Sequence, residues 1–202
     1  MKLPNSVHES HPWVISEIAP DFRLLDVWAL PAEGKADEFP SLLQIMASFD
    51  PAAIDNVAAR FLFAVRLRVG GWLGWDETTE TRPIPGSSET TLSARLPEHL
   101  RGSAESPVIG ESMQRAAGGF NSLYLTDREW AGEISNATVH GVMHLAWVDQ
   151  GEGRYRGRLA VYVKPRGRLG DAYMLLIDPF RHLIVYPALM RQIGRAWETR
   201  SS

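Results

Sequence analysis

The chain contains no cysteine, and this absence excludes three kinds of chemistry. A disulfide framework, a zinc site built on thiolates and a cysteine nucleophile all require that side chain. A reducing compartment is compatible with the absence, and we expect a cytoplasmic protein. The first residues, MKLPNSVHESHPW, also lack the apolar centre of a secretory signal. We therefore expect residues 1–20 to form a flexible lead-in.

The chain also lacks an apolar run of the length that a membrane span needs, which is about 20 residues. The most apolar stretch, YMLLIDPFRHLIVYPALMRQIGRAW, is interrupted by Asp178, Arg181, His182 and Arg191. A membrane span is therefore not expected. At helical spacing, the first half of this stretch carries an apolar stripe formed by Leu169, Tyr173, Leu176, Phe180, Leu183, Ile184 and Pro187.

Beyond Pro187 the apolar positions are Met190, Ile193 and Trp197, which lie about a quarter turn away from that stripe. Asp178 and Pro179 have the residue types of a helix start, and a proline inside a helix removes a backbone donor. We therefore expect a long C-terminal helix that bends at its prolines.

Basic charge is scarce in most of the chain and concentrated at its end. Residues 154–202 hold 10 of the 21 Lys and Arg residues but 3 of the 24 Asp and Glu residues. Few aromatic residues lie among these basic ones, and the net charge is −3, so we expect no nucleic-acid partner. The acidic and basic parts are expected to complement each other within one fold.

Segments typical of strands occur at about 22–30 and in four stretches between 121 and 165. Leu159, Val161 and Val163 alternate with Arg158 and Tyr162, which predicts a sheet with one buried face. Helices are expected within 37–50 and from 51 to about 72. Residues 21–200 are thus predicted to form one α+β domain, in which helices cover one face of an antiparallel sheet. A long excursion at 74–119 is expected either to be partly ordered, with a strand near 90–96 and a short helix near 109–116, or to form a mobile cover over a site.

His140 and His144 are four residues apart on one predicted strand, so their Cα atoms would be about 13 Å apart. They cannot bind one metal ion together, and we expect them on the strand surface and predict no metal site. The carboxylates of TDREWAGE are expected at a solvated hairpin end. The arginines of RYRGR are expected on the solvent face of an edge strand.

Several segments resemble a bacterial family of domains of unknown function: RLRVGGWLGWD, RPIPGSSETTLSARLPEHLRGS, SLYLTDREWAGEISNATVHGVMHLAWV and YRGRLAVYVKPRGRLGDAYMLLIDPFRHLIVYPALMRQI. The run from Pro165 to Tyr173 is distinctive. The resemblance covers residues 20–197 and implies a helix-grip fold of the START-like (SRPBCC) kind. In that fold a curved antiparallel sheet wraps a long C-terminal helix around an apolar cavity. The family also occurs fused to short-chain-dehydrogenase-like domains, but this chain has no G-x-G-x-x-G loop, and we expect no cofactor.

Three functions are compatible with these patterns. The first is binding of a hydrophobic small molecule between the sheet and the C-terminal helix, in a pocket lined by Met143, Trp147, Tyr173, Phe180 and Trp72. The second is an enzyme of the cyclase, isomerase or hydrolase type, which needs a polar group inside the cavity. The candidates for that group are His140, His144, Tyr124 and Glu133. The third is a homodimer or a partner domain for a reductase, suggested by surplus apolar residues on the C-terminal helix.

Overall fold

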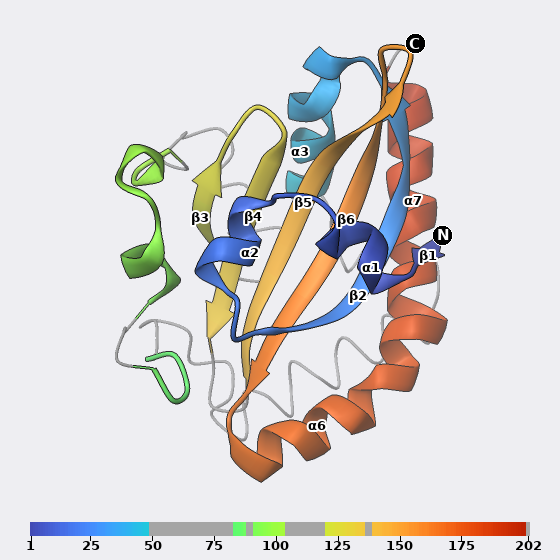
Figure 1. The fold of residues 1–202 in the computed structure, drawn as a ribbon. Helices are drawn as coiled ribbons and strands as arrows, with labels where there is room; N and C mark the ends of the chain where they lie inside the picture. The colour runs from blue at the N-terminus through green and yellow to red at the C-terminus, as the bar shows by residue number, and fades with distance from the viewer. Residues whose placement is uncertain (49–82, 88–90, 104–119, 136–138, 201–202) are drawn as a thin grey trace.

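The structure is a computed structural model that describes residues 1–48, 83–87, 91–103, 120–135 and 139–200. Its centre is a curved, antiparallel sheet of six strands in the order β1-β2-β6-β5-β4-β3 (Figure 1). The strands are β1 (Lys2–Leu3), β2 (Arg23–Gly34), β3 (Asn121–Leu125), β4 (Glu129–Ser135), β5 (Val139–Gly151) and β6 (Arg154–Pro165). The predicted α+β class and the strand segments are confirmed.

Short helices precede β2, and longer ones follow β2 and β6. The α-helices are α1 (Asn5–Glu9), α2 (Val14–Ile18), α3 (Phe39–Ala47), α6 (Gly167–Phe180) and α7 (Tyr186–Thr199). Single 3-10 turns occur at η1 (Ala36–Glu38), η3 (Leu92–Arg95) and η4 (Glu98–Leu100). The predicted helix within 37–50 is α3. The strand predicted near 90–96 is wrong, because η3 occupies residues 92–95. The predicted helix from 51 to 72 and most of the excursion at 74–119 lie outside the described residues.

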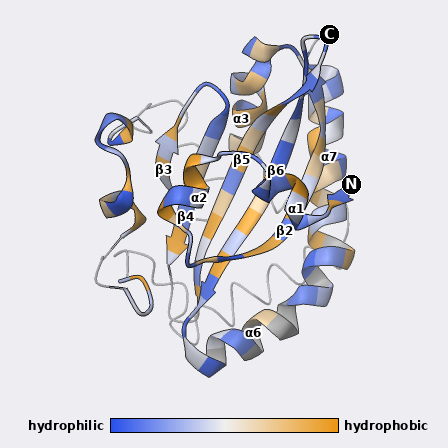
Figure 2. Cartoon of the chain, in the orientation of Figure 1, coloured by the Kyte–Doolittle hydropathy of each residue, from blue (hydrophilic) through white to orange (hydrophobic). Residues whose placement is uncertain are grey.

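The β5–β6 hairpin sets the register of the longest strand pair. Its turn contains Gly151, Glu152 and Gly153 with φ angles of 86°, 56° and 72°. Two glycines suit this turn because they adopt positive φ without steric cost. The end of this hairpin is hydrophilic, in contrast to the middle of the strands (Figure 2). His144 then pairs with Ala160, and Trp147 pairs with Gly157.

One face of the sheet, here called the helix face, packs against α3 and α7. Its core includes Leu30, Leu42, Trp147, Leu159 and Trp197. A Cβ on Gly157 would stand 2.9 Å from a methyl group of Leu42, so the absence of a side chain there allows α3 to approach the sheet.

The opposite face, here called the histidine face, is covered by α1, α2 and the turns η3 and η4 (Figure 1). Its apolar residues include Trp13, Ile15, Val142, Ala160 and Tyr162. The prediction of a sheet with one buried face is therefore wrong. The structure also differs from the prediction for residues 1–20, which form β1, α1 and α2 and bury side chains against the sheet.

The position of β6 changes the interpretation of the RYRGR segment. β6 lies between β2 and β5 in the middle of the sheet, so it is not the edge strand that the charge pattern predicted. Arg154 is exposed, Arg156 is half-buried and Arg158 is buried. Three arginines on alternate positions of one strand therefore have three different environments.

The C-terminal region bends as predicted, but at a different place. A π-helix, Arg181–Val185, separates α6 from α7, and the two helices run in different directions (Figure 1). Pro179 lies inside α6, so Asp178 does not start a helix. Two prolines flanking the π-helix remove two backbone donors, which favours a change of hydrogen-bonding pattern between them. Leu183 is 76% exposed and does not belong to a buried stripe, whereas Ile193 and Trp197 are buried as predicted. None of the described helices is long and apolar enough to cross a membrane.

Candidate functional site

Two histidines of β5 lie on the histidine face and are completely buried. Both His140 and His144 have an exposed fraction of 0%. They share the strand face with Val142 and Ala146, and α1 and α2 cover that face. The prediction of a strand-surface position is therefore wrong, because the N-terminal segment and the 3-10 turns supply a second layer over the sheet.

The first polar network is centred on Glu129 of β4. Its Oε2 atom accepts hydrogen bonds from the Tyr124 hydroxyl at 3.1 Å and from the Val14 backbone N–H at 3.1 Å. The Nε2 atom of His144 lies 3.2 Å from the same oxygen. Glu129 is 9% exposed, so a carboxylate predicted at a solvated hairpin end is buried and receives three donors.

The second network repeats the same pairing four residues away on each strand. His140 Nε2 lies 2.7 Å from Glu133 Oε2, and Glu133 is 3% exposed. The ring of His140 packs edge-on against Phe22, with 5.2 Å between the ring centroids. Strand register explains the repetition, because Glu129 and Glu133 face β5 at positions diagonal to the two histidines.

Burial determines the protonation of the first network. Desolvation lowers the pKa of His144, against the raising effect of Glu129, so the ring is neutral near pH 7. Desolvation and the nearby Glu129 charge raise the pKa of Tyr124, which stays a phenol and donates its proton. A neutral His144 that donates from Nε2 to Glu129 carries its lone pair on Nδ1.

The Nδ1 atoms of both histidines have no hydrogen-bond partner among the described residues, although both atoms are buried. Buried polar atoms normally have a partner, so two unpaired atoms of the same kind in equivalent positions require an explanation. A carboxylate behind an imidazole fixes the ring and stabilises its protonated form, which is the arrangement of a general base.

His8 and Trp13 cover the first network. The His8 ring lies 5.2 Å from the His144 ring and 5.6 Å from the Trp13 ring, measured between centroids. Burial first, and then the charges of neighbouring groups, lower the pKa of His8 to about 2. Neither ring nitrogen of His8 has a hydrogen-bond partner in the described part of the chain. The site therefore contains three buried histidines with an unpaired nitrogen.

The predicted pocket residues have different positions. Trp147 is 1% exposed, packs between Phe39 and Trp197 and donates its Nε1–H to the Lys35 carbonyl at 2.8 Å. Met143 is half-buried against the same cluster. Trp72 and the side chains of Tyr173 and Phe180 lie outside the described residues. The structure thus places Met143 and Trp147 on the helix face, opposite the histidine cluster.

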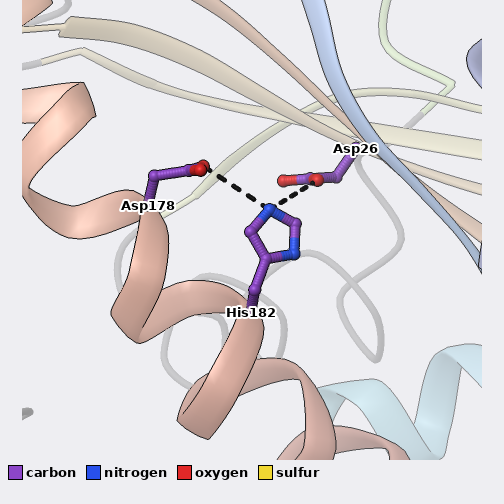
Figure 3. Close-up of side chains that lie close together, drawn as sticks. All are labelled: Asp26, Asp178 and His182. Atoms are coloured by element: carbon purple, nitrogen blue, oxygen red, sulfur yellow. Dashed lines mark ion pairs between the residues drawn. The ribbon is translucent and has the colours of Figure 1, made fainter.

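A second polar cluster connects β2 with the C-terminal helices. His182 Nε2 lies 3.1 Å from an oxygen of Asp26 and 3.5 Å from an oxygen of Asp178 (Figure 3). Among the described residues, these three are the group whose ligand atoms are close enough to share a metal ion, all within 4.8 Å of one another. Asp26 is the buried member, with an exposed fraction of 1%.

Cationic side chains already neutralise this cluster. Lys2 Nζ lies 3.1 Å from Asp26 Oδ1, and Arg181 forms an ion pair with Oδ2. The Tyr186 hydroxyl donates to Oδ2 at 3.1 Å. A metal ion would have to replace Lys2 and lie beside the Arg181 guanidinium, which is electrostatically unfavourable. We therefore interpret the cluster as an ion-pair network that fixes the π-helix to β2.

Sequence reasoning named His140, His144, Tyr124 and Glu133 as candidate polar groups, and the structure places all four on the buried histidine face. The sequence patterns did not identify His8 or Arg158 as candidates. One signal was present, because β5 residues on the same face as the histidines are apolar. A strand face with Val142, Ala146 and Val148 is more typical of a covered layer than of a solvated surface.

Comparisons with known proteins give a family but no relative of known function. Neither the curated proteins nor the solved structures include a match to this chain. A family model described as "Protein of unknown function (DUF2867)" matches residues 18–188. This match covers well over half of the chain, and it supports the resemblance to a domain of unknown function. The chain therefore belongs to the DUF2867 family.

Proposed function

We propose that the protein is an enzyme that transfers protons on a small, largely apolar molecule bound at the histidine face, as an isomerase, a cyclase or a hydrolase does. One observation carries this proposal. The Nδ1 atoms of His140 and His144 are buried and have no partner in the described structure, while each Nε2 lies against a carboxylate. The apolar and aromatic residues around the histidines fit a ligand of the same character.

The chemistry follows from the hydrogen bonds of His144. Its Nδ1 lone pair accepts a proton from an acidic C–H group of the ligand, and the C–H electron pair passes into the carbonyl group to form an enolate. Glu129 then stabilises the imidazolium, and the proton returns to the ligand carbon in the reverse step. The dry surroundings strengthen this electrostatic support. Because His140 is about 13 Å away along the strand, it would act at a different part of the ligand.

Access requires movement of the N-terminal segment. His8 and Trp13 pack directly on His144, and the histidines are fully buried. The helices of this segment, α1 and α2, have five residues each. Short helices contribute little stability of their own, so displacement of this segment costs less than displacement of α3 or α7.

The test uses 2-tetralone, an apolar ketone with acidic α-protons, in deuterated water. We expect the protein to accelerate exchange of these protons, measured by proton NMR. His144→Asn retains a side chain that can contact Glu129 but cannot accept the proton. It should slow the protein-dependent exchange by about a hundredfold or more. His99→Asn, at an exposed histidine, is the control. Equal exchange rates for the wild type and His144→Asn would contradict the proposal.

A second candidate is passive binding in a helix-grip fold of the START-like kind, with the hydrophobic ligand between the sheet and the C-terminal helices. The curved antiparallel sheet, and the half-buried position of Met143 on the helix face, favour it. Trp147, Tyr173, Phe180 and Trp72 would complete that pocket. Titration of the protein with 2-tetralone, followed by NMR of the protein, separates the two sites. A ligand on the helix face would shift the NMR signal of the Met143 methyl group and not those of the histidine rings.

A homodimer or a reductase partner would be bound through exposed apolar residues of the C-terminal region, of which Leu183 is an example. A cytoplasmic location stays a prediction of the sequence.

A further inference from the structure

Arg158 lies in the centre of the sheet, on the histidine face. It pairs with Ala29 of β2 on one side and with Ala146 of β5 on the other. Its exposed fraction is 6%, so the residue as a whole is more than nine-tenths buried. Arginine is rarely buried to this extent without a carboxylate partner.

In the described part of the chain, Arg158 forms no ion pair. Its one hydrogen bond runs from Nη1 to the Val7 carbonyl of α1, at 3.0 Å. Other arginines are paired with carboxylates, as Arg156 is with Glu33 and Arg181 is with Asp26. A single carbonyl oxygen does not compensate a buried positive charge, because the charge loses its hydration and gains one neutral acceptor.

The neighbours of Arg158 include the Val7 carbonyl and the neutral rings of His8 and His144. The Arg158 charge contributes to lowering the pKa of His8 and of His144, which places the three side chains in one electrostatic environment. His144 pairs with Ala160, so it is diagonal to Arg158 on the same face. The nearest network carboxylate, Glu129, already receives three donors at its Oε2 atom and is held on the side of β4.

We propose that Arg158, together with His8, forms a subsite for the carboxylate group of the ligand, so that the substrate is an apolar carboxylic acid. This inference rests on the proposed function and specifies its substrate class. The guanidinium binds the carboxylate through two parallel hydrogen bonds, and a ring nitrogen of His8 donates a third. The apolar part of the acid then extends along the aromatic side chains toward His144, where proton transfer takes place.

The test compares two probes of the same shape, 2-naphthoate and 2-naphthamide, by isothermal titration calorimetry on the full chain. We expect the wild type to bind the carboxylate about ten- to a hundredfold more tightly than the amide, because charge-assisted hydrogen bonds are the stronger ones. Arg158→Gln should weaken binding of the carboxylate much more than binding of the amide, and so remove this preference. Arg154→Gln, on the same strand but 70% exposed in its side chain, should retain the preference and is the matched control.

Two outcomes overturn the inference: equal affinity of the wild type for both probes, or an unchanged preference in Arg158→Gln. If Arg158→Gln does not fold, Arg158→Lys keeps the charge but lacks the planar fork, and we expect a reduced preference. The result is distinguishable from failure of the proposed function. If the wild type exchanges the 2-tetralone protons but has no carboxylate preference, the subsite alone is contradicted. If the wild type does not accelerate the exchange, the proposed proton transfer by His144 is contradicted.

Discussion

The two faces of the sheet are built from alternate residues of the same strands, yet they differ in how their polar atoms are satisfied. On the helix face, the indole N–H groups of Trp147 and Trp197 donate to the carbonyls of Lys35 and Glu33 at 2.8 and 2.9 Å. On the histidine face, buried nitrogens of His8, His140 and His144 have no partner among the described residues. Satisfied polar groups stabilise a fold, and unsatisfied ones destabilise it. The helix face also has one buried indole N–H without a partner, that of Trp28, but the histidine face gathers unpaired nitrogens of three histidines, and it carries the proposed chemistry.

The largest expected effect comes from the helix face. Trp147→Ala removes a fully buried indole that packs on Phe39, Tyr155 and Trp197. We expect the free energy of unfolding to fall by about 3–5 kcal/mol. Urea denaturation followed by circular dichroism measures this loss. A decrease below about 1 kcal/mol would show that Trp147 lines an empty or adaptable space instead of a packed core.

A change of opposite sign is expected on the histidine face. His8→Phe replaces a buried ring without hydrogen-bond partners by an apolar ring of similar shape. We expect the free energy of unfolding to rise by about 1 kcal/mol near pH 7, because a buried unpaired polar group costs about 1–3 kcal/mol. The same denaturation measurement applies, and a clear loss of stability would mean that His8 has a partner that compensates its burial.

The pH dependence of stability sharpens this prediction. The pKa of His8 is about 2 in the folded protein and about 6.5 when unfolded, so the unfolded chain binds more protons between these values. The stability of the folded protein, in which His8 is neutral, is therefore not reduced by this titration above pH 6.5. It falls as the pH decreases below that value, by up to about 1.4 kcal/mol per pH unit. His8→Phe should have a smaller loss between pH 6.5 and pH 5 than the wild type, while His99→Asn should behave as the wild type does.

The smallest effect is expected at Leu183, which belongs to neither face. Its side chain is 76% exposed on the π-helix, so Leu183→Glu should change the free energy of unfolding by less than about 0.5 kcal/mol. Native mass spectrometry at low concentration then tests the proposed dimer. A wild-type dimer that becomes monomeric in the variant supports an interface at this position. The same oligomeric state in both proteins excludes it.

The strands and their faces could be predicted from the sequence because period-two alternation is a local property. Met143, Leu145 and Trp147 were correctly separated from His140 and His144 on this basis. What covers each face is not a local property. α1 and α2 are too short to produce a helical stripe, and their covering role depends on contacts with strands more than a hundred residues away. The burial of the histidines was therefore missed, although their strand face was assigned correctly.

The acidic half of the site shows a related limit. Glu129 and Glu133 are charged residues beside a turn, for which exposure is the ordinary expectation. Their burial follows from pairing with histidines on the neighbouring strand, which requires knowledge of the β4–β5 register. Arg158 was assigned to an edge strand for the same reason. Strand order depends on long-range pairing, and the pattern of a single strand does not determine it.

The π-helix between α6 and α7 has a consequence for how sequence changes are tolerated there. Its i→i+5 hydrogen bonding accommodates one more residue per turn than an α-helix does. That additional residue turns the following segment by about 100°, which matches the quarter-turn offset that places Ile193 and Trp197 against the sheet. Removing a single residue within Arg181–Val185 would restore regular α-helical winding and rotate Trp197 away from Glu33. The length of this short turn, more than the identity of its residues, thus determines how the end of the chain docks.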